Sequence, residues 1–390
     1  MTPGTAAGRA KRTAAGRAKR TAARGAGGAP RFRDDLLEAF SNAPGVSGGE
    51  GAVRSIVAQA VRDHVDSLEV DAMGSLVARV APSDGAARSS RENGAASRGR
   101  RPPHVMLCAH LDEVGVMVTA IEKEGRLKFR RVGGLDPRIL VSQVFRIGPR
   151  RVPGVVGTLP AHMVTHADEE KVTPFEELYL DIGAASREEA SREVSIGDHG
   201  VFDTTYERWG TIRKGKAFDD RAGCAVLASL IQRRPPLPVT AVWSVQEEVG
   251  LRGATAAARR VAPDVAIVLE GTAAGEAPGA TGDESAPHMG EGPAVTIQDR
   301  SLMADPGLVR TIERIAKSRR IPIQWKRPGI GGTDAGKIAL SGAGVAAAVV
   351  SVPCRYIHAP AAYLDLRDAQ RAVDLVWHTL EALRKEWPPR

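Results

Sequence analysis

Short apolar runs alternate with helix-patterned segments along most of the chain from residue 104 onward, and this alternation constrains the fold more than any other feature. The apolar runs have the length and continuity of buried strands and lie at 104–110, 239–246, 264–270 and 345–353. The segments with apolar residues on one helix face lie at 217–234, 253–261, 306–320 and 366–387. Strands and helices in this order form a mostly parallel sheet covered on both faces. We therefore expect an α/β fold with a three-layer αβα domain.

Residues 113–205 interrupt this alternation. Six short β-like segments follow one another there, with Gly, Pro or Asp turns between them and no long helix between most of them. This pattern predicts a small β-barrel inserted into the α/β domain. The expected organisation is a tail, the first part of the α/β domain, the barrel insert and the second part of the α/β domain, at 1–33, 34–112, 113–205 and 206–390.

The basic excess of the chain lies in its first 33 residues. They contain nine of the 54 Lys and Arg residues and no acid, so the other 45 basic residues face 46 Asp and Glu residues. The octad AAGRAKRT occurs at 6–13 and again at 14–21, and such sequence buries too little apolar surface to offset its ordering entropy. We interpret the tail as disordered and solvated, with weak contact to nucleic acid as the alternative. The polar stretch 83–103 predicts a long surface loop.

Composition argues against several classes of protein. No run approaches the roughly 18 apolar residues of a membrane-spanning helix, and the N-terminus lacks the apolar core of a secretory signal. A transit peptide is disfavoured because no Ser precedes Ser41 in the Arg-rich tail. Cys108, Cys224 and Cys354 are far apart and lie in or beside apolar stretches, so we interpret them as core residues in a reducing compartment. We expect a cytoplasmic protein.

Histidines and carboxylates gather at the carboxyl ends of the predicted strands. Those that end or follow a strand, or begin the helix at 217–234, are His110, Asp112, Asp219, Asp220, Glu247, Glu248, Glu270 and His358. In open α/β sheets, ligands bind outside the carboxyl ends of the strands. Backbone N–H groups at the start of a helix also favour carboxylates such as the Asp pair. We expect these side chains to meet at one edge of the sheet.

Each of these residues alone has an ordinary explanation. A histidine after a strand is usually a turn residue, an Asp pair at a helix start is a cap with a solvated neighbour, and a Glu pair is a solvated loop. Their coincidence at one edge indicates a site. Two histidines with three or four carboxylates suit two divalent cations such as Zn²⁺, Co²⁺ or Mn²⁺, held about 3.5–4 Å apart by a bridging carboxylate.

The sequence resembles the TET-type aminopeptidases of metallopeptidase family forty-two, a family of glutamyl and deblocking aminopeptidases in which some members are labelled endoglucanases. The resemblance covers residues 34 to 385 and keeps the order of the family's motifs. The matching stretches are APGVSGGEGAVR (43–54), VDAMGSLVA (70–78), AHLDEVGVMV (109–118), GKAFDDRAG (215–223), QEEVGLRGA (246–254), VLEGTAAGEAPG (268–279), GGTDAG (331–336) and SVPCRYIHAP (351–360).

The resemblance implies a ligand set for two metal ions. His110, Asp219 and Glu270 would bind one ion. Asp219, Glu248 and His358 would bind the other, so that Asp219 bridges the pair. Many relatives have Asp at the position of Glu270, and the longer Glu can still bind a metal.

The resemblance also implies the remaining roles. Asp112 would orient His110 from behind, and Glu247 would be the general base that moves a proton from water to the leaving amine. Many relatives have Asp in place of Glu276 and Ser in place of Ala359. The barrel would be a PDZ-like insert that acts in dimerisation and access, and the subunits would assemble into tetrahedral particles of about twelve.

The expected function is a dinuclear-metal aminopeptidase that hydrolyses N-terminal residues from peptides. A dinuclear-metal deacylase or carboxypeptidase would share the same metal-binding core and remains an alternative. An endoglucanase is a weaker one, because glycosidases need two carboxylates that flank the bond and have no use for two histidine ligands. An inactive scaffold or nucleic-acid-associated protein would rely on the basic tail, and the complete ligand set argues against it.

Overall fold

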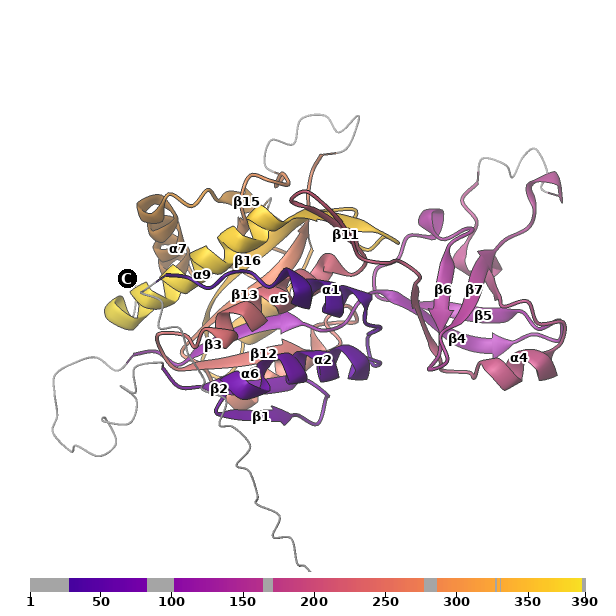
Figure 1. The fold of residues 1–390 in the computed structure, drawn as a ribbon, viewed down its shortest axis with the longest axis horizontal. Helices are drawn as coiled ribbons and strands as arrows, with labels where there is room; N and C mark the ends of the chain where they lie inside the picture. The colour runs from indigo at the N-terminus through magenta and orange to yellow at the C-terminus, as the bar shows by residue number, and fades with distance from the viewer. Residues whose placement is uncertain are drawn as a thin grey trace, which may run out of the picture.

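The computed structural model describes residues 28–82, 102–163, 171–276, 286–326, 328–329 and 331–387. Within them a large sheet with helices on both sides lies beside a separate closed barrel (Figure 1). The described helices longer than one turn are α1 (Asp34–Asn42), α2 (Gly51–Val61), α4 (Arg187–Glu193), α5 (Phe218–Gln232), α6 (Arg252–Val261), α7 (Pro306–Arg319), α8 (Asp334–Ala339) and α9 (Leu366–Glu386). None of them combines the length and apolarity needed to span a membrane.

The large sheet has eleven strands in the described part of the chain. They are β1 (Ser67–Val70), β2 (Leu76–Val80), β3 (Val105–His110), β10 (Glu207–Trp209), β11 (Ile212–Gly215), β12 (Val239–Ser244), β13 (Val265–Ala273), β14 (Ala294–Thr296), β15 (Gln324–Lys326), β16 (Ala346–Arg355) and β17 (Ala362–Asp365). Its centre is parallel and has the order β12-β3-β13-β16. These four strands are the apolar runs that the sequence predicts, so their carboxyl ends share one edge.

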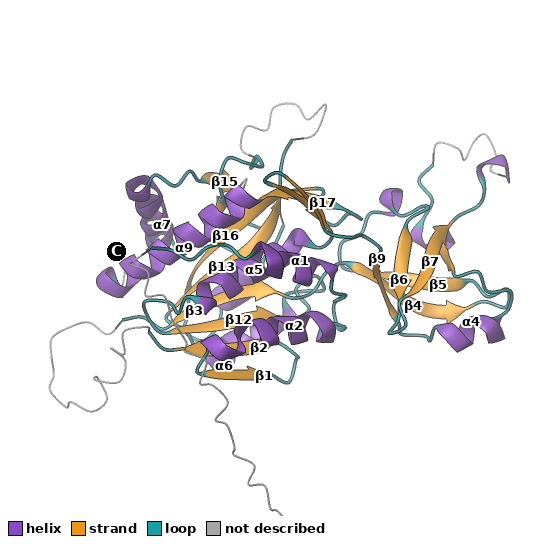
Figure 2. Cartoon of the chain, viewed as in Figure 1, coloured by secondary structure: helices purple, strands orange, loops and turns teal. Residues whose placement is uncertain are grey.

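Helices cover both faces of the central strands (Figure 2), and alternate residues of these strands pack against different helix layers. On β3, Val105 and Leu107 join the core that includes residues of α1, α2, α5, α7 and α9. Met106 and Cys108 join the core that includes residues of α6 and α8. Strands buried on both faces need apolar residues at every position, which is why these runs are continuous. The expected α/β class with a helix layer on each side is confirmed.

The barrel contains the six β-like segments that the sequence predicts within 113–205. Its strands are β4 (Gly115–Ile121), β5 (Leu127–Val132), β6 (Val144–Ile147), β7 (Val152–Gly157), β8 (Tyr179–Asp181) and β9 (His199–Phe202), closed in the order β4-β5-β8-β7-β6-β9. The rings of Phe145 and Phe202 meet inside it with centroids 4.5 Å apart. The barrel therefore has a core of its own.

Helix ends follow local signals that the sequence carries. Asp365 caps α9 as predicted, because its side chain accepts a hydrogen bond from the backbone N–H of Arg367. The helix expected from residue 217 begins differently. Asp219 (φ −84°, ψ 105°) and Asp220 (φ −119°, ψ 40°) have non-helical backbone within α5.

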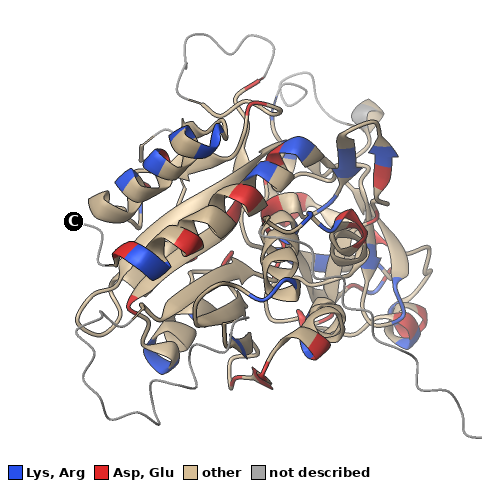
Figure 3. Ribbon diagram, turned by 60° about the vertical axis from the view of Figure 1, so that its left-hand side comes forward, with Lys and Arg blue, Asp and Glu red and all other residues tan. Residues whose placement is uncertain are grey.

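Acidic and basic residues are interspersed on the outer helices (Figure 3).

Residues 28–33 pack against the body, although composition assigns them to the tail. The backbone N–H of Phe32 donates to Gln370 Oε1 at 2.7 Å, and Gln370 Nε2 donates to the carbonyl of Pro30 at 3.0 Å. The N–H of Arg33 donates to Ser229 Oγ at 3.1 Å. The first described residues are thus held by α5 and α9. The octad repeats, and residues 83–101 of the predicted surface loop, lie outside the described residues.

Candidate metal centre

The central strands deliver the candidate ligands to one edge of the sheet. His110 is the last residue of β3, Glu270 lies near the end of β13, and Glu248 follows β12. His358 follows β16, and Asp219 lies at the start of α5. These five side chains form two groups whose ligand atoms lie within 4.8 Å of one another. The structure thus brings together the five side chains that the sequence places at this edge, while their binding of metal stays a prediction.

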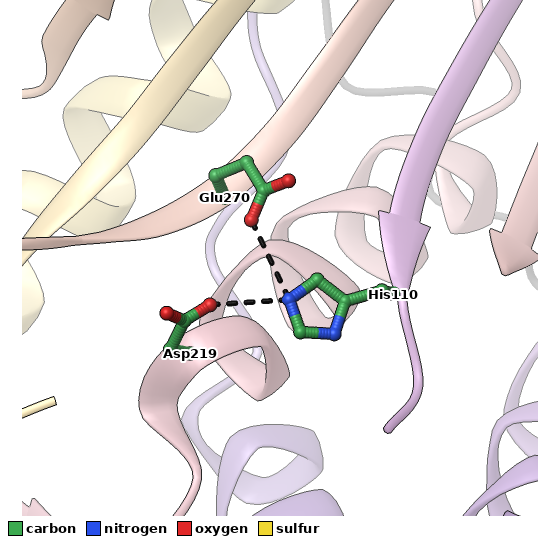
Figure 4. Close-up of side chains that lie close together, drawn as sticks. All are labelled: His110, Asp219 and Glu270. Carbon is green, nitrogen blue, oxygen red and sulfur yellow. Dashed lines mark hydrogen bonds and ion pairs between the residues drawn. The ribbon is translucent and has the colours of Figure 1, made fainter. Parts of the chain in front are cut away.

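The first group contains His110, Asp219 and Glu270 (Figure 4). The Nε2 atom of His110 lies 3.1 Å from Asp219 Oδ1 and 3.6 Å from Glu270 Oε2. His110 projects from β3 and Glu270 from β13, so two neighbouring parallel strands fix their separation. All three side chains are largely enclosed by protein.

The second group shares Asp219 with the first. The Nε2 atom of His358 lies 3.4 Å from Asp219 Oδ2 and 3.0 Å from Glu248 Oε1. Asp219 therefore turns one carboxylate oxygen toward each histidine. A carboxylate in this position can bridge two cations, one in each group.

The chemistry of these residues fits two divalent cations. The Oε1 atom of Glu270 is buried and has no hydrogen-bond donor among the described residues. A buried carboxylate oxygen without a partner is costly unless a cation compensates it. Imidazole nitrogen and carboxylate oxygen are ligands of Zn²⁺, Co²⁺ and Mn²⁺, and no cysteine belongs to either group.

Strong electrostatic coupling links the two groups. Burial opposes the charge of Asp219, but hydrogen bonds from His110 and His358 outweigh it and lower the pKa of Asp219. For His358, the hydrogen bonds to Asp219 and Glu248 outweigh burial and raise its pKa to about 11. Burial, followed by the charge of Asp220, raises the pKa of Glu270 well above its ordinary value. The histidine protons stand between ring nitrogen and carboxylate, where a cation would lie.

Asp112 lies beside His110, and its carboxylate also contacts the segment that follows β12. The Nδ1 atom of His110 lies 3.1 Å from the backbone oxygen of Asp112 and 3.5 Å from its Oδ1. The Asp112 carboxylate accepts hydrogen bonds from the backbone N–H groups of Glu247 (3.0 Å) and Glu248 (3.1 Å). Asp112 thus fixes the segment that carries the expected base and one ligand.

Two further residues that the sequence analysis leaves without a role support the same segment. Ser47 donates to Asp112 Oδ2 at 2.6 Å, and Glu50 Oε1 accepts from the backbone N–H of Gln246 at 3.2 Å. Together, Glu50 and Asp112 satisfy three consecutive N–H groups. Ser47 and Glu50 belong to the APGVSGGEGAVR stretch, which marks the resemblance but contains no metal-ligand pattern of its own.

Two more carboxylates lie near the groups without joining them. Asp220 accepts from the backbone N–H groups of His110 (3.0 Å) and Gly223 (2.9 Å), so it caps the regular part of α5. Asp334, from the GGTDAG stretch, accepts from Ser244 Oγ at 2.5 Å. Burial raises the pKa of Asp334 to about 6, although Ser244 and His110 oppose the shift. Both residues are buried supports of the site.

The backbone beside the ligands has an uncommon conformation. Gln246 (φ 57°), Tyr356 (φ 60°) and His358 (φ 56°) occupy the left-handed region without being glycine. Non-glycine residues in this region concentrate at functional sites, where surrounding contacts hold them. The turns after β12 and β16 therefore aim Glu248 and His358 at the cost of local strain.

Known proteins match this chain over most of its length. The family model described as M42 glutamyl aminopeptidase matches residues 94–375. The lysyl aminopeptidase of Pyrococcus furiosus is 32% identical over 361 residues, which are 90% of this chain and 97% of that protein.

Solved structures agree with the sequence comparison. The TET aminopeptidase of a marine sediment archaeon of the Thaumarchaeota has a TM-score of 0.80 at 34% identity, over 90% of this chain and 98% of that chain. The TET1 peptidase of Pyrococcus horikoshii, which can assemble into a tetrahedron or a large octahedral shell, has a TM-score of 0.74 at 31% identity, over 90% and 99% of the two chains. With its fold, its gathered side chains and these relatives, the chain belongs to the M42 glutamyl aminopeptidase family of peptidases.

Proposed function

We propose that this chain is a dinuclear-metal aminopeptidase that removes N-terminal residues from peptides. The observation that carries the proposal is the position of Asp219, which offers one oxygen to each of two His-carboxylate groups. His110, Asp219 and Glu270 would hold one cation, and Asp219, Glu248 and His358 the other. Zn²⁺ and Co²⁺ suit these ligands best, with Mn²⁺ as a further candidate.

When bound, a pair of divalent cations supplies Lewis acidity and lowers the pKa of water. The protein's own residues provide the rest. Glu247 takes a proton from the attacking water at its carboxylate and returns it to the leaving amine. Asp112 and Glu50 hold the backbone of residues 246–248, so that Glu247 and Glu248 keep separate directions.

The rival metal-dependent reactions differ in the end of the substrate that they require. An aminopeptidase should hydrolyse aminoacyl amides with a free α-amine and leave their N-acetylated counterparts intact. A deacylase would prefer the acetylated substrates, and a carboxypeptidase would need a free terminal carboxylate. A panel of matched free and blocked substrates, including Glu and Lys amides, tests the proposal. Hydrolysis of the blocked set alone would overturn it.

We also propose a cytoplasmic location, which the three free, buried cysteines support.

We infer that the subunits assemble into a tetrahedral dodecamer, as the relatives that carry the TET name suggest. The described part of the chain has an apolar groove of about 650 Å³ that includes Met303 and Leu340. These side chains are 74% and 79% exposed, and a second copy of the chain would cover them.

Light scattering should report a particle of about twelve times 41.2 kDa in the presence of metal. Leu340→Lys should shift the mass toward smaller species, because a charge would be buried at the contact. Lys337→Ala, in the helix α8 that ends just before Leu340, is the matched control and should leave the mass unchanged. A wild-type monomer at micromolar concentration would contradict the assembly, and an unchanged mass for Leu340→Lys would remove this groove from it.

A further inference from the structure

The barrel insert reaches the second metal group through one short loop. Residues 133–136 connect β5 to the 3-10 turn Pro137–Ile139. Leu135 is buried in the barrel core, and its carbonyl accepts a hydrogen bond from Arg131 at 3.2 Å. Asp136 caps the turn that follows, by accepting from the backbone N–H of Arg138. The loop is therefore fixed to the barrel at both of its ends.

The carbonyl of Gly134 holds the ring of His358. The Nδ1 atom of His358 lies 3.1 Å from Gly134 O. A carbonyl oxygen only accepts hydrogen bonds, so Nδ1 donates its proton to Gly134 O, and Nε2 is the ring nitrogen left to face a cation. Nε2 faces Glu248 Oε1 and Asp219 Oδ2, at 3.0 and 3.4 Å, where a bound cation would take the place of its proton. The loop thus sets the tautomer that a metal ligand requires.

The two glycines of this loop also leave room for the ligands. A Cβ atom on Gly134 would lie 3.0 Å from His358 Nδ1, the atom that Gly134 O holds. A Cβ atom on Gly133 would lie 3.2 Å from Glu248 Cβ and 2.8 Å from Val114 Cγ1. Gly133 also has φ +80°, a conformation that glycine adopts without strain. A side chain at either position would therefore crowd the ligands of the second metal group.

The first group is supported differently. His110 is held by the backbone oxygen of Asp112, at the end of the strand that carries both residues. Glu270 lies on β13, next to β3 in the sheet. No described hydrogen bond from the barrel loop reaches either side chain. Displacing this loop would disturb His358 and Glu248 and leave His110 and Glu270 in place.

We propose that the barrel loop 133–135 is a positioning element for the second metal group, and that affinity at this group depends on the barrel while affinity at the first group does not. The inference rests on the two-metal proposal above. It assigns Gly134 O the role of fixing the orientation of His358, and it assigns Gly133 the role of admitting Glu248.

The test measures metal binding by the full-length chain, independently of activity. Metal-free protein is titrated with Co²⁺, and the bound ions are counted by equilibrium dialysis with elemental analysis and by the absorption of the bound cobalt. Gly134→Ala and Gly133→Ala should bind one Co²⁺ as the wild type does, and the other about 10-fold to 100-fold more weakly, the usual effect of disturbing the residues that support a metal ligand. The absorption should change for one ion only.

Gly183→Ala is the matched control. Gly183 also lies in the barrel and has φ +79°, but nothing lies within 4 Å of a Cβ atom there. This variant should bear the backbone strain of Gly133→Ala and still bind both ions normally. Gly134 does not have positive φ, so Gly134→Ala tests the contact with His358 without that strain.

The outcomes separate the two proposals. Binding of fewer than two Co²⁺ ions by the wild-type chain would refute the two-metal function itself. If the wild type binds two and both loop variants bind two with unchanged affinity, only the role of the loop is overturned. Equal weakening of both ions, or weakening in Gly183→Ala, would likewise reject a selective role of the loop. Circular dichroism of each variant confirms that the comparison is made between folded proteins.

Discussion

Glu247→Gln is expected to lower the turnover rate by about 100-fold to 10,000-fold, the usual contribution of general acid–base catalysis. The amide keeps the shape of the side chain but cannot accept a proton. Metal content should stay at two ions per chain, because Glu247 belongs to neither ligand group. Its backbone N–H would still donate to Asp112, so the segment should keep its position. Steady-state kinetics and elemental analysis of the same samples measure both quantities.

The neighbouring substitution Glu248→Gln is the matched comparison. It removes a charged oxygen 3.0 Å from His358 Nε2 and should weaken one metal ion. Part of the activity should return at high metal concentration, which Glu247→Gln would not show. If Glu247→Gln loses metal while Glu248→Gln keeps it, the two roles are exchanged. If neither substitution changes the rate, this edge of the sheet is not the active site.

Removal of metal should abolish peptidase activity and lower the stability of the fold. Without cations, the buried Oε1 atom of Glu270 has no hydrogen-bond donor among the described residues. Activity should fall below detection after dialysis against a chelator and return on addition of Co²⁺ or Zn²⁺. An ion present at 100 times its dissociation constant stabilises the folded state by about 2.7 kcal/mol, so the denaturation midpoint should fall and recover in parallel. Full activity in samples verified to be metal-free would refute the mechanism.

The sequence predicts the centre of the fold better than its edges. The four parallel strands β3, β12, β13 and β16 are mostly apolar and buried at almost every position, because helices cover both of their faces. Edge strands such as β1 and β10 have mostly exposed or half-exposed residues. Their short, partly polar sequences look like loops, and only pairing with the neighbouring strands β2 and β11 makes them part of the sheet.

The candidate ligands were predictable for a similar reason. Each ligand ends or follows a predicted strand or lies at the start of a predicted helix. In a parallel sheet, the carboxyl ends of the strands lie at one edge, where ligands bind. The supporting contacts have no such signal. Glu50 reaches Gln246 across 196 residues, and Gly134 reaches His358 across 224. Gly134 matters for its backbone carbonyl and for the space that its missing side chain leaves, and neither property distinguishes it in the sequence from an ordinary turn glycine.

The order in which the chain leaves the ribosome has a consequence for this architecture. The strands of the barrel are contiguous in sequence, so the barrel can close early in synthesis. β3, by contrast, lies between β12 and β13, and both are made only after the barrel. β3 therefore stays unpaired, with its apolar side chains uncovered, until these two strands have been synthesised. The delay is long near the start of the described chain too, since Phe32 forms a hydrogen bond with Gln370, which is synthesised 338 residues later. A premature stop before α9 would therefore remove the partner of Pro30 and Phe32 and leave residues 28–33 with their contact to Ser229 of α5.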